Sequence, residues 1–89
     1  MIPEFVKPFL WSYNLSALDL GRDKKRIITN VLNLGTKEAT DWLISIYGKD
    51  DILDALNNPL RGEWNKKSLA YWCLLYQVPF KEAVIRDNQ

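Results

Sequence analysis

An uninterrupted apolar run near the C-terminal end of the chain, residues 69–76, most constrains the fold. It reads Leu-Ala-Tyr-Trp-Cys-Leu-Leu-Tyr and contains no charged residue. In a helix, a run of this kind is apolar on every side, so other elements must surround it. A buried strand of the same length is the alternative, and periodicity alone does not distinguish the two.

The residues around the run favour a helix. Asn65 is a good N-cap, and Val78-Pro79 ends the element because the residue before a proline disfavours helical backbone. A helix over residues 66–77 has an ordinary length for a globular protein. We therefore expect this segment to be the buried central helix of an all-α domain, a compact bundle of four to five short helices.

Capping residues and apolar spacing predict the helices before it. Asp19 is the expected N-cap of the first helix, which Gly35 ends at a positive φ. Thr36 caps a second helix, and Asp50 or Asp51 caps a short third helix that ends before Asn58-Pro59. The second helix has the clearest amphipathic pattern, with an i, i+3, i+4, i+7, i+8 spacing. Its expected inward residues are Ala39, Trp42, Leu43, Ile46 and Tyr47.

The two ends of the chain complete the expected domain. Pro3 and Pro8 interrupt an N-terminal segment that is too hydrophobic to be a free tail. We expect it to be an extended arm that lies across the helical core or across a second subunit. A last helix is expected over residues 80–86. Residues 1–89 then form a single domain, with arm and turn over residues 1–18 and the helical core over residues 19–86.

Composition narrows the class of partner. Twelve basic and eleven acidic residues give a net charge of +1, which is no electrostatic footprint for nucleic acid or an anionic membrane. No apolar stretch reaches the roughly 18–20 residues that a membrane span needs. The single cysteine, Cys73, lies within the apolar run and fits a buried small residue in a reducing compartment. These features predict a cytoplasmic protein without a membrane partner.

The sequence lacks the residue types on which most catalytic and metal sites depend. There is no histidine, the cysteine has no activating partner, and the four glycines are isolated. Asp50, Asp51 and Asp54 form the main acidic cluster, which fits a helix N-terminus better than a cation site. We expect no cofactor, no metal and no enzymatic activity. A small-molecule enzyme using carboxylates and lysines is the third hypothesis.

A dense basic patch offers a different function. Arg22, Lys24, Lys25 and Arg26 could contact phosphate or an acidic partner, although a solvated face is the favoured interpretation. The second and third expected helices, joined by a turn at Gly48, also mimic a helix-turn-helix. The third helix would present acidic residues to phosphates, which opposes binding. A small DNA-binding regulator is therefore the second hypothesis.

Short signatures occur along most of the chain. They are Phe9-Leu10-Trp11-Ser12-Tyr13-Asn14, Leu18-Asp19-Leu20, Asp23-Lys24, Val31-Leu32-Asn33-Leu34-Gly35-Thr36, Trp42-Leu43, Tyr47-Gly48, Arg61-Gly62-Glu63-Trp64 and Trp72-Cys73-Leu74. In this order they resemble a small prokaryotic family of unknown function, over residues 9–78. Members are often encoded beside a nucleotidyltransferase of the abortive-infection toxin type, so the resemblance implies an antitoxin-like role. The resemblance implies no catalytic motif in this chain.

Two of these signatures contain residue types that dominate binding hot spots. Trp11 and Tyr13 lie in the arm, and Arg61 and Trp64 lie in a loop. The alternative is that Trp11 and Trp64 seal opposite ends of the core helix. The first hypothesis is therefore a non-enzymatic protein-interaction module, and the resemblance implies that it is an antitoxin that binds a nucleotidyltransferase toxin. A homodimer through the arm or a tryptophan patch is also expected.

Overall fold

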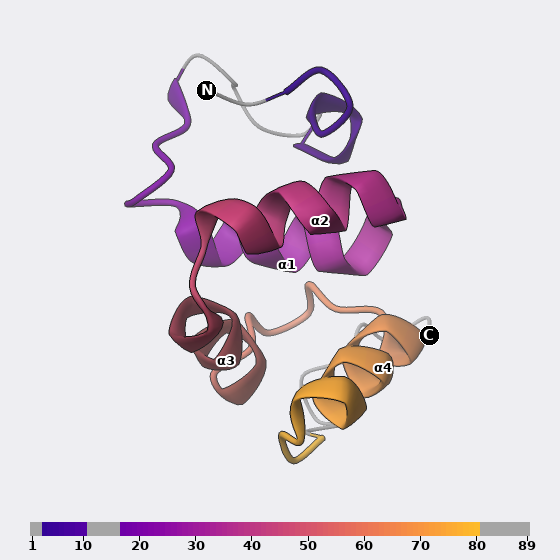
Figure 1. Ribbon diagram of the computed structural model, residues 1–89. Coiled ribbons are helices and arrows are strands. Elements are labelled where there is room, and N and C mark those ends of the chain that lie inside the picture. Colours follow the sequence, from indigo (N-terminus) through magenta and orange to yellow (C-terminus); the bar gives the residue numbers. More distant parts are fainter. Residues whose placement is uncertain (1–2, 11–16, 81–89) are drawn as a thin grey trace.

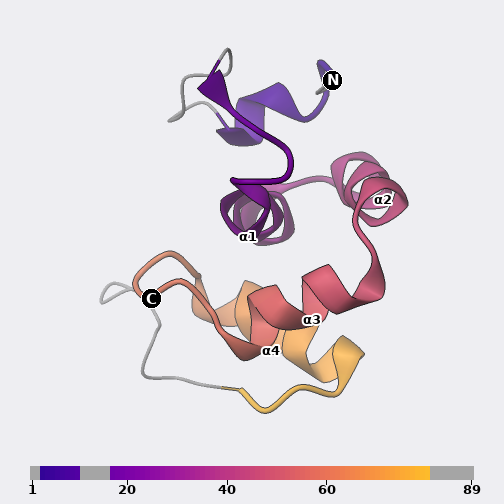
Figure 2. The same ribbon diagram turned by 90° about the vertical axis from the view of Figure 1, so that its left-hand side faces the viewer.

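The computed structural model describes residues 3–10 and 17–80. A short 3-10 helix, η1, is followed by four α-helices in this part of the chain. Figure 1 shows α1 and α2 side by side in one layer and α3 and α4 beneath them, and Figure 2 views the α1–α2 layer end-on. The expected all-α fold is confirmed, while the predicted helix over residues 80–86 lies outside the described residues except for Phe80. The elements are η1 Lys7–Leu10, α1 Lys24–Leu34, α2 Lys37–Ile46, α3 Lys49–Asn57 and α4 Lys66–Tyr76.

The central element of the fold is α1. Its residues Ile27, Ile28 and Val31 are fully buried, and α1 packs against η1, α2, α3 and α4. The spacing i, i+1, i+4 covers a broad arc of a helix, so different sides of α1 can meet different neighbours. One hydrophobic cluster joins these residues with buried residues of the other elements.

The prediction that α4 is the enclosed central helix is wrong. Among its residues only Leu69 and Cys73 are buried. These two are four positions apart and therefore lie on one side of the helix. Because α4 contacts α1 and α3 from one side only, its apolar sequence is divided between the core and the surface.

Two predicted N-caps are confirmed and two are wrong. The Thr36 side chain accepts the N–H of Ala39 at 3.2 Å, and the Asn65 side chain accepts that of Ser68 at 3.1 Å. However, α1 begins at Lys24, because residues 20–23 form a separate turn stabilised by Asp19. The third helix begins at Lys49 with Gly48 as N-cap, which places Asp50 and Asp51 within its first turn.

Gly35 ends α1 as predicted but not by a positive φ. Its φ is −76° and its ψ is 163°, an extended conformation that any residue adopts. A Cβ atom here would collide with the Val31 carbonyl oxygen and would lie 3.2 Å from Val31 Cγ1. Close backbone approach is therefore the reason for glycine at this position.

The N-terminal arm is not extended in its described part. Residues Lys7–Leu10 form η1, and the N–H of Phe9 donates to the Val6 carbonyl oxygen at 3.0 Å. Pro8 is tolerated in a first helical turn because no donor is needed there. Val6 and Leu10 are fully buried, and η1 packs against α1. Of the two expected positions, across the chain's own core or across a second subunit, the described part of the arm takes the first.

The amphipathic pattern of α2 is confirmed at three of its five expected positions. Ala39, Leu43 and Tyr47 are buried. Trp42 is half-buried, and Ile46, with 41% of its surface exposed, was wrongly predicted to face inward. Among the described elements α2 packs mainly on α1, and Ile46, at the edge of the predicted stripe, remains in solvent.

No helix in the described ranges is long and apolar enough to cross a membrane.

Candidate interaction surface

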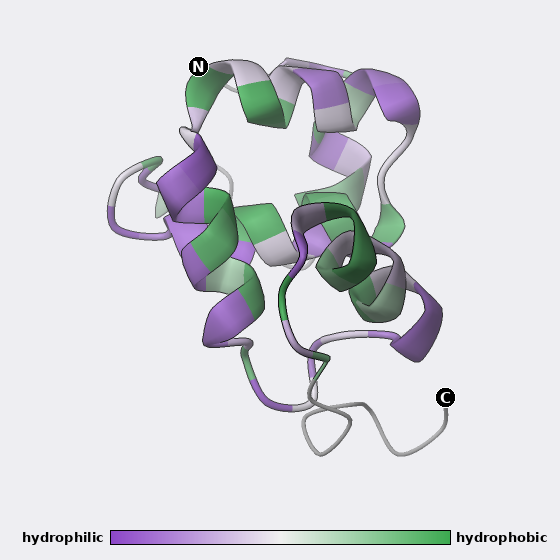
Figure 3. Cartoon of the chain, turned by 60° about the horizontal axis from the view of Figure 1, so that its bottom comes forward, coloured by the Kyte–Doolittle hydropathy of each residue, from purple (hydrophilic) through white to green (hydrophobic). Residues whose placement is uncertain are grey.

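The exposed side of α4 carries three large exposed hydrophobic residues. Tyr71, Leu74 and Leu75 have 56%, 81% and 57% of their surface exposed. They are spaced i, i+3, i+4 and therefore share one side of the helix. We call these three residues the α4 face. Figure 3 shows α4, the helix that leads toward the grey C-terminal segment, as hydrophobic along most of its length.

The α4 face is held in place by hydrogen bonds between other α4 side chains and the end of α1. The indole N–H of Trp72 donates to the Leu32 carbonyl oxygen at 2.9 Å, and the hydroxyl of Ser68 donates to the Asn33 carbonyl oxygen at the same distance. The Tyr71 ring packs edge-on against Trp72 with ring centroids 4.9 Å apart. These contacts fix the rotation of α4 about its axis, so the three exposed side chains are presented by a rigid element.

The other exposed apolar residues are distributed over several elements. They are Phe5 before η1, Leu34 in α1, Ile44 and Ile46 in α2, and Phe80 after α4. Single exposed apolar residues are normal on protein surfaces. The α4 face differs because three such residues are neighbours on one helix.

Of the four predicted partner-binding residues, the structure describes Arg61 and Trp64. Trp11 and Tyr13 lie outside the described residues. Arg61 is exposed in the loop before α4, whereas Trp64 is fully buried. The indole N–H of Trp64 has no hydrogen-bond partner among the described residues. The structure therefore places Trp64 in the core.

Sequence reasoning missed the α4 face, although all three of its residues were visible in the apolar run. The run was read as evidence for burial on every side. The signal that could have revealed the face is the small size of the domain. With few short helices there are not enough neighbours to cover an apolar helix completely.

The predicted basic patch lies at the start of α1, and three of its cations are paired with carboxylates. Arg22 contacts Asp23 at 2.7 Å, and Lys24 contacts Asp51 of α3 at 2.7 Å. The hydrogen bond to Asp51 is the main reason that the pKa of Lys24 is raised. Lys25 lies 3.5 Å from Asp54 and donates to the Asn58 carbonyl oxygen at 3.1 Å.

These ion pairs oppose DNA binding. Carboxylates next to Arg22, Lys24 and Lys25 neutralise the positive charge that binding to DNA phosphates requires. The fourth basic residue, Arg26, is exposed and its charge helps to lower the pKa of Asp23. No group of three or more potential metal ligands comes together in the described parts of the chain.

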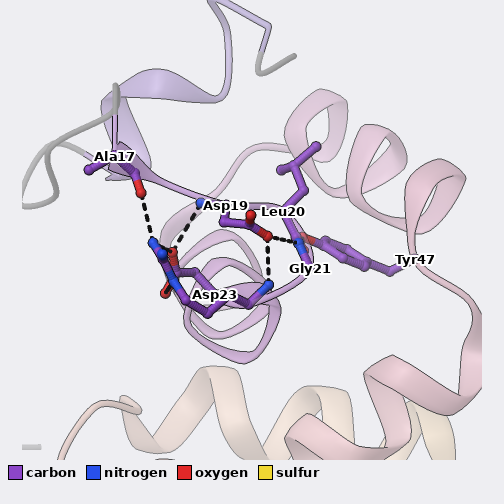
Figure 4. Close-up of polar contacts among 7 residues, drawn as sticks. Ala17, Asp19, Leu20, Gly21, Asp23 and Tyr47 are labelled. Atoms are coloured by element: carbon purple, nitrogen blue, oxygen red, sulfur yellow. Dashed lines mark hydrogen bonds and ion pairs between the residues drawn. The ribbon is translucent and has the colours of Figure 1, made fainter.

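Two carboxyl groups with lowered pKa values lie in the turn before α1 (Figure 4). The Asp19 carboxylate accepts the N–H groups of Arg22 and Gly21 at 2.8 Å, and these two bonds lower its pKa. The Asp23 carboxylate accepts from the Arg22 side chain and from the N–H of Asp19, which likewise lowers its pKa. The two carboxylates thus close a turn, and this is a structural role.

Tyr47 has a strongly raised pKa. Its hydroxyl donates to the Leu20 carbonyl oxygen at 2.7 Å. Figure 4 shows the Tyr47 side chain reaching the turn that contains Leu20. Burial raises the pKa of Tyr47 to about 12, and the nearby carboxylates of Asp51, Asp19 and Asp23 add to this effect. The phenol therefore stays protonated and joins α2 to the turn before α1.

Comparison with known proteins adds one match. A family model described as a family of unknown function (DUF6922) matches residues 5–56. The matched range ends within α3, whereas the resemblance seen in the sequence was placed on residues 9–78. No curated protein and no solved structure matches the chain.

Proposed function

Because the chain belongs to DUF6922, a family of unknown function, we propose its role from its own surface: a non-enzymatic module that binds a partner protein through the α4 face. The observation that carries the proposal is the exposure of Tyr71, Leu74 and Leu75 side by side. Together they expose apolar surface on the order of a few hundred Å², comparable to the largest apolar patch of a typical monomer, which is often functional. The match to the family ends before α4, so the proposal rests on these residues alone.

The rigidity of α4 supports the proposal. Binding costs free energy when loops and side chains must be ordered at an interface. The hydrogen bonds of Ser68 and Trp72 to α1 already fix the helix, which reduces this cost. A tyrosine at the edge of the face is also typical of binding hot spots.

Charge at one end of α4 indicates the chemistry of the partner. Arg61 and Lys67 are exposed, one in the loop before α4 and one in its first turn. A partner with an apolar stripe would match the α4 face, and acidic groups at one end of that stripe would match Arg61 and Lys67. For the identity of that partner we propose a nucleotidyltransferase-type toxin, which is supported by the resemblance in the sequence only.

Co-expression with such a toxin, followed by affinity purification, tests the proposal. Wild-type protein should co-purify with the toxin, and Leu74→Asp should weaken the complex at least tenfold because a carboxylate would be buried at the interface. Leu74 is 81% exposed, so this substitution should change the free energy of unfolding by only about 0.5 kcal/mol.

Ile44→Asp is the matched control. Ile44 is an exposed aliphatic residue of α2, 45% accessible and on a different helix. It should retain the toxin at the wild-type level. If soluble toxin does not bind the wild-type protein, the toxin assignment is overturned; if Leu74→Asp binds as well as wild type, the α4 face is the wrong surface.

A further inference from the structure

We infer that a second copy of this chain covers the α4 face when no other partner is bound. The two α4 helices pair in an antiparallel arrangement about a two-fold axis. The α4 face carries no charge, so placing it against its own copy creates no like-charge contact. Self-association then competes with the binding of a partner protein. This consequence rests on the function proposed above.

The position of Lys67 selects the antiparallel arrangement. Lys67 precedes Tyr71 by four residues and Leu74 by seven, so it lies in line with the α4 face. Opposing Tyr71 of one copy with Leu74 of the other brings Lys67 near the exposed Gln77 of the second copy. Gln77 follows the C-terminus of α4, where the helix dipole is negative and a cation is favoured.

A parallel pair is electrostatically worse. It would bring the two Lys67 side chains together and align both helix dipoles in the same direction. In the antiparallel pair the two positive ends lie at opposite ends of the contact. Eleven residues separate them by roughly 16 Å, which exceeds the Debye length at physiological salt of about 8 Å.

The size of the face sets the strength of the dimer. A stable interface buries about 800 Å² on each partner, and three side chains supply less than this. The dimer is therefore weak, with a dissociation constant in the micromolar range or above. A weak dimer covers the α4 face at high protein concentration, and a partner that binds more tightly displaces the second copy.

Sedimentation equilibrium of the isolated protein, from about 10 µM to about 1 mM, tests this inference. Wild-type protein should shift from monomer to dimer over this range, Leu74→Asp should remain monomeric, and Ile44→Asp should behave as wild type. A wild-type protein that is monomeric at 1 mM, or a Leu74→Asp variant that still dimerises, overturns it. The toxin is absent from this measurement, so its outcome is separate from that of the co-purification.

Charge exchange tests the orientation. Lys67→Glu should weaken the dimer about fivefold or more, because it brings a carboxylate to the negative end of the facing helix. Adding Gln77→Lys in the same chain should restore the dimer, since the ammonium introduced in one copy then faces the carboxylate introduced in the other. Recovery is not expected from a parallel pair, in which position 67 faces its own copy; failure of the double variant to recover would exclude the antiparallel arrangement.

Discussion

The side chain of Asn33, at the end of α1, accepts the backbone N–H of Asn65 at 2.9 Å, while Asn65 in turn caps α4. Asn33 also donates to the Glu63 carbonyl oxygen at 3.2 Å. One buried amide of α1 thereby fixes the loop before α4 and the residue at which α4 starts. The α4 face is presented by a helix whose beginning is set from another part of the chain.

Asn33→Ala should destabilise the fold by about 2–3 kcal/mol, because it leaves the Asn65 N–H and the Glu63 carbonyl without their partner in a partly buried place. Urea unfolding measures the loss. Asn57→Ala is the control, since the Asn57 side chain is exposed and its amide bonds to the Leu53 carbonyl of its own helix. Equal losses in the two variants would contradict the role of Asn33.

Gln77→Gly should stabilise the protein by about 0.5–1 kcal/mol. Gln77 ends α4 in the left-handed region, at φ 59° and ψ 46°, where side chains other than glycine are disfavoured. Thermal unfolding measures the shift. Gln77→Ala keeps the cost of the left-handed backbone and removes only the side chain, so it should stay close to wild type. A Gln77→Gly variant with an unchanged midpoint would refute the prediction.

Gly35→Ala should lower the free energy of unfolding by about 2–3 kcal/mol, because the added Cβ meets the Val31 carbonyl oxygen and the end of α1 must shift. Gly48→Ala is the comparison, since a Cβ at Gly48 meets no atom within 4 Å. Its cost should stay below about 1 kcal/mol, the loss expected for alanine at an N-cap. The prediction fails if the two glycines tolerate alanine equally.

Tyr47 should make the protein sensitive to alkaline pH. Its folded pKa of about 12 exceeds the unfolded value of about 10, so its contribution is complete below pH 10 and is lost as the pH rises toward 12. A shift from about 10 to about 12 corresponds to a loss of at most about 2–3 kcal/mol at pH 12. Tyr47→Phe should lower stability at neutral pH by about 1 kcal/mol by removing the bond to Leu20.

Comparison with Tyr47→Phe also separates the contribution of the tyrosine to alkaline instability from that of the lysines. Lys24 and Lys37 have raised pKa values through bonds to Asp51 and Asp41, so they too lose stabilising contacts as the pH rises. The difference between wild type and Tyr47→Phe from pH 9 to 12 reports Tyr47 alone. Parallel stability curves would show that the phenol does not contribute.

Asp19 should contribute to the loss of stability in acid. Its folded pKa lies below the unfolded value of about 3.9, so its contribution is present above that value and disappears as the pH falls through the folded pKa. Asp19→Asn should therefore flatten the decline in stability between about pH 5 and pH 2. The largest causes are backbone hydrogen bonds, so 1 M salt should leave the Asp19-dependent part largely in place. An unchanged acid slope in the variant would contradict this assignment.

Local sequence signals predicted local structure well. Thr36 and Asn65 cap helices because their side chains reach an N–H three residues ahead, a contact that depends only on neighbouring residues. The helical class followed for the same reason. Asp19 misled the prediction because its carboxylate can stabilise an isolated turn as well as a helix start, and the two alternatives have the same sequence signal.

The sequence by itself determined that the described chain forms short amphipathic helices, because capping and apolar spacing act over a few residues. Only the tertiary structure decided which helix is central and which surface remains open. Burial depends on how many neighbours reach a helix, and contacts such as Trp72 with Leu32 join residues that are 40 positions apart. For that reason α1 occupies the centre that was predicted for the apolar run, and Leu74 of that run became the most exposed of the large hydrophobic residues in the described chain.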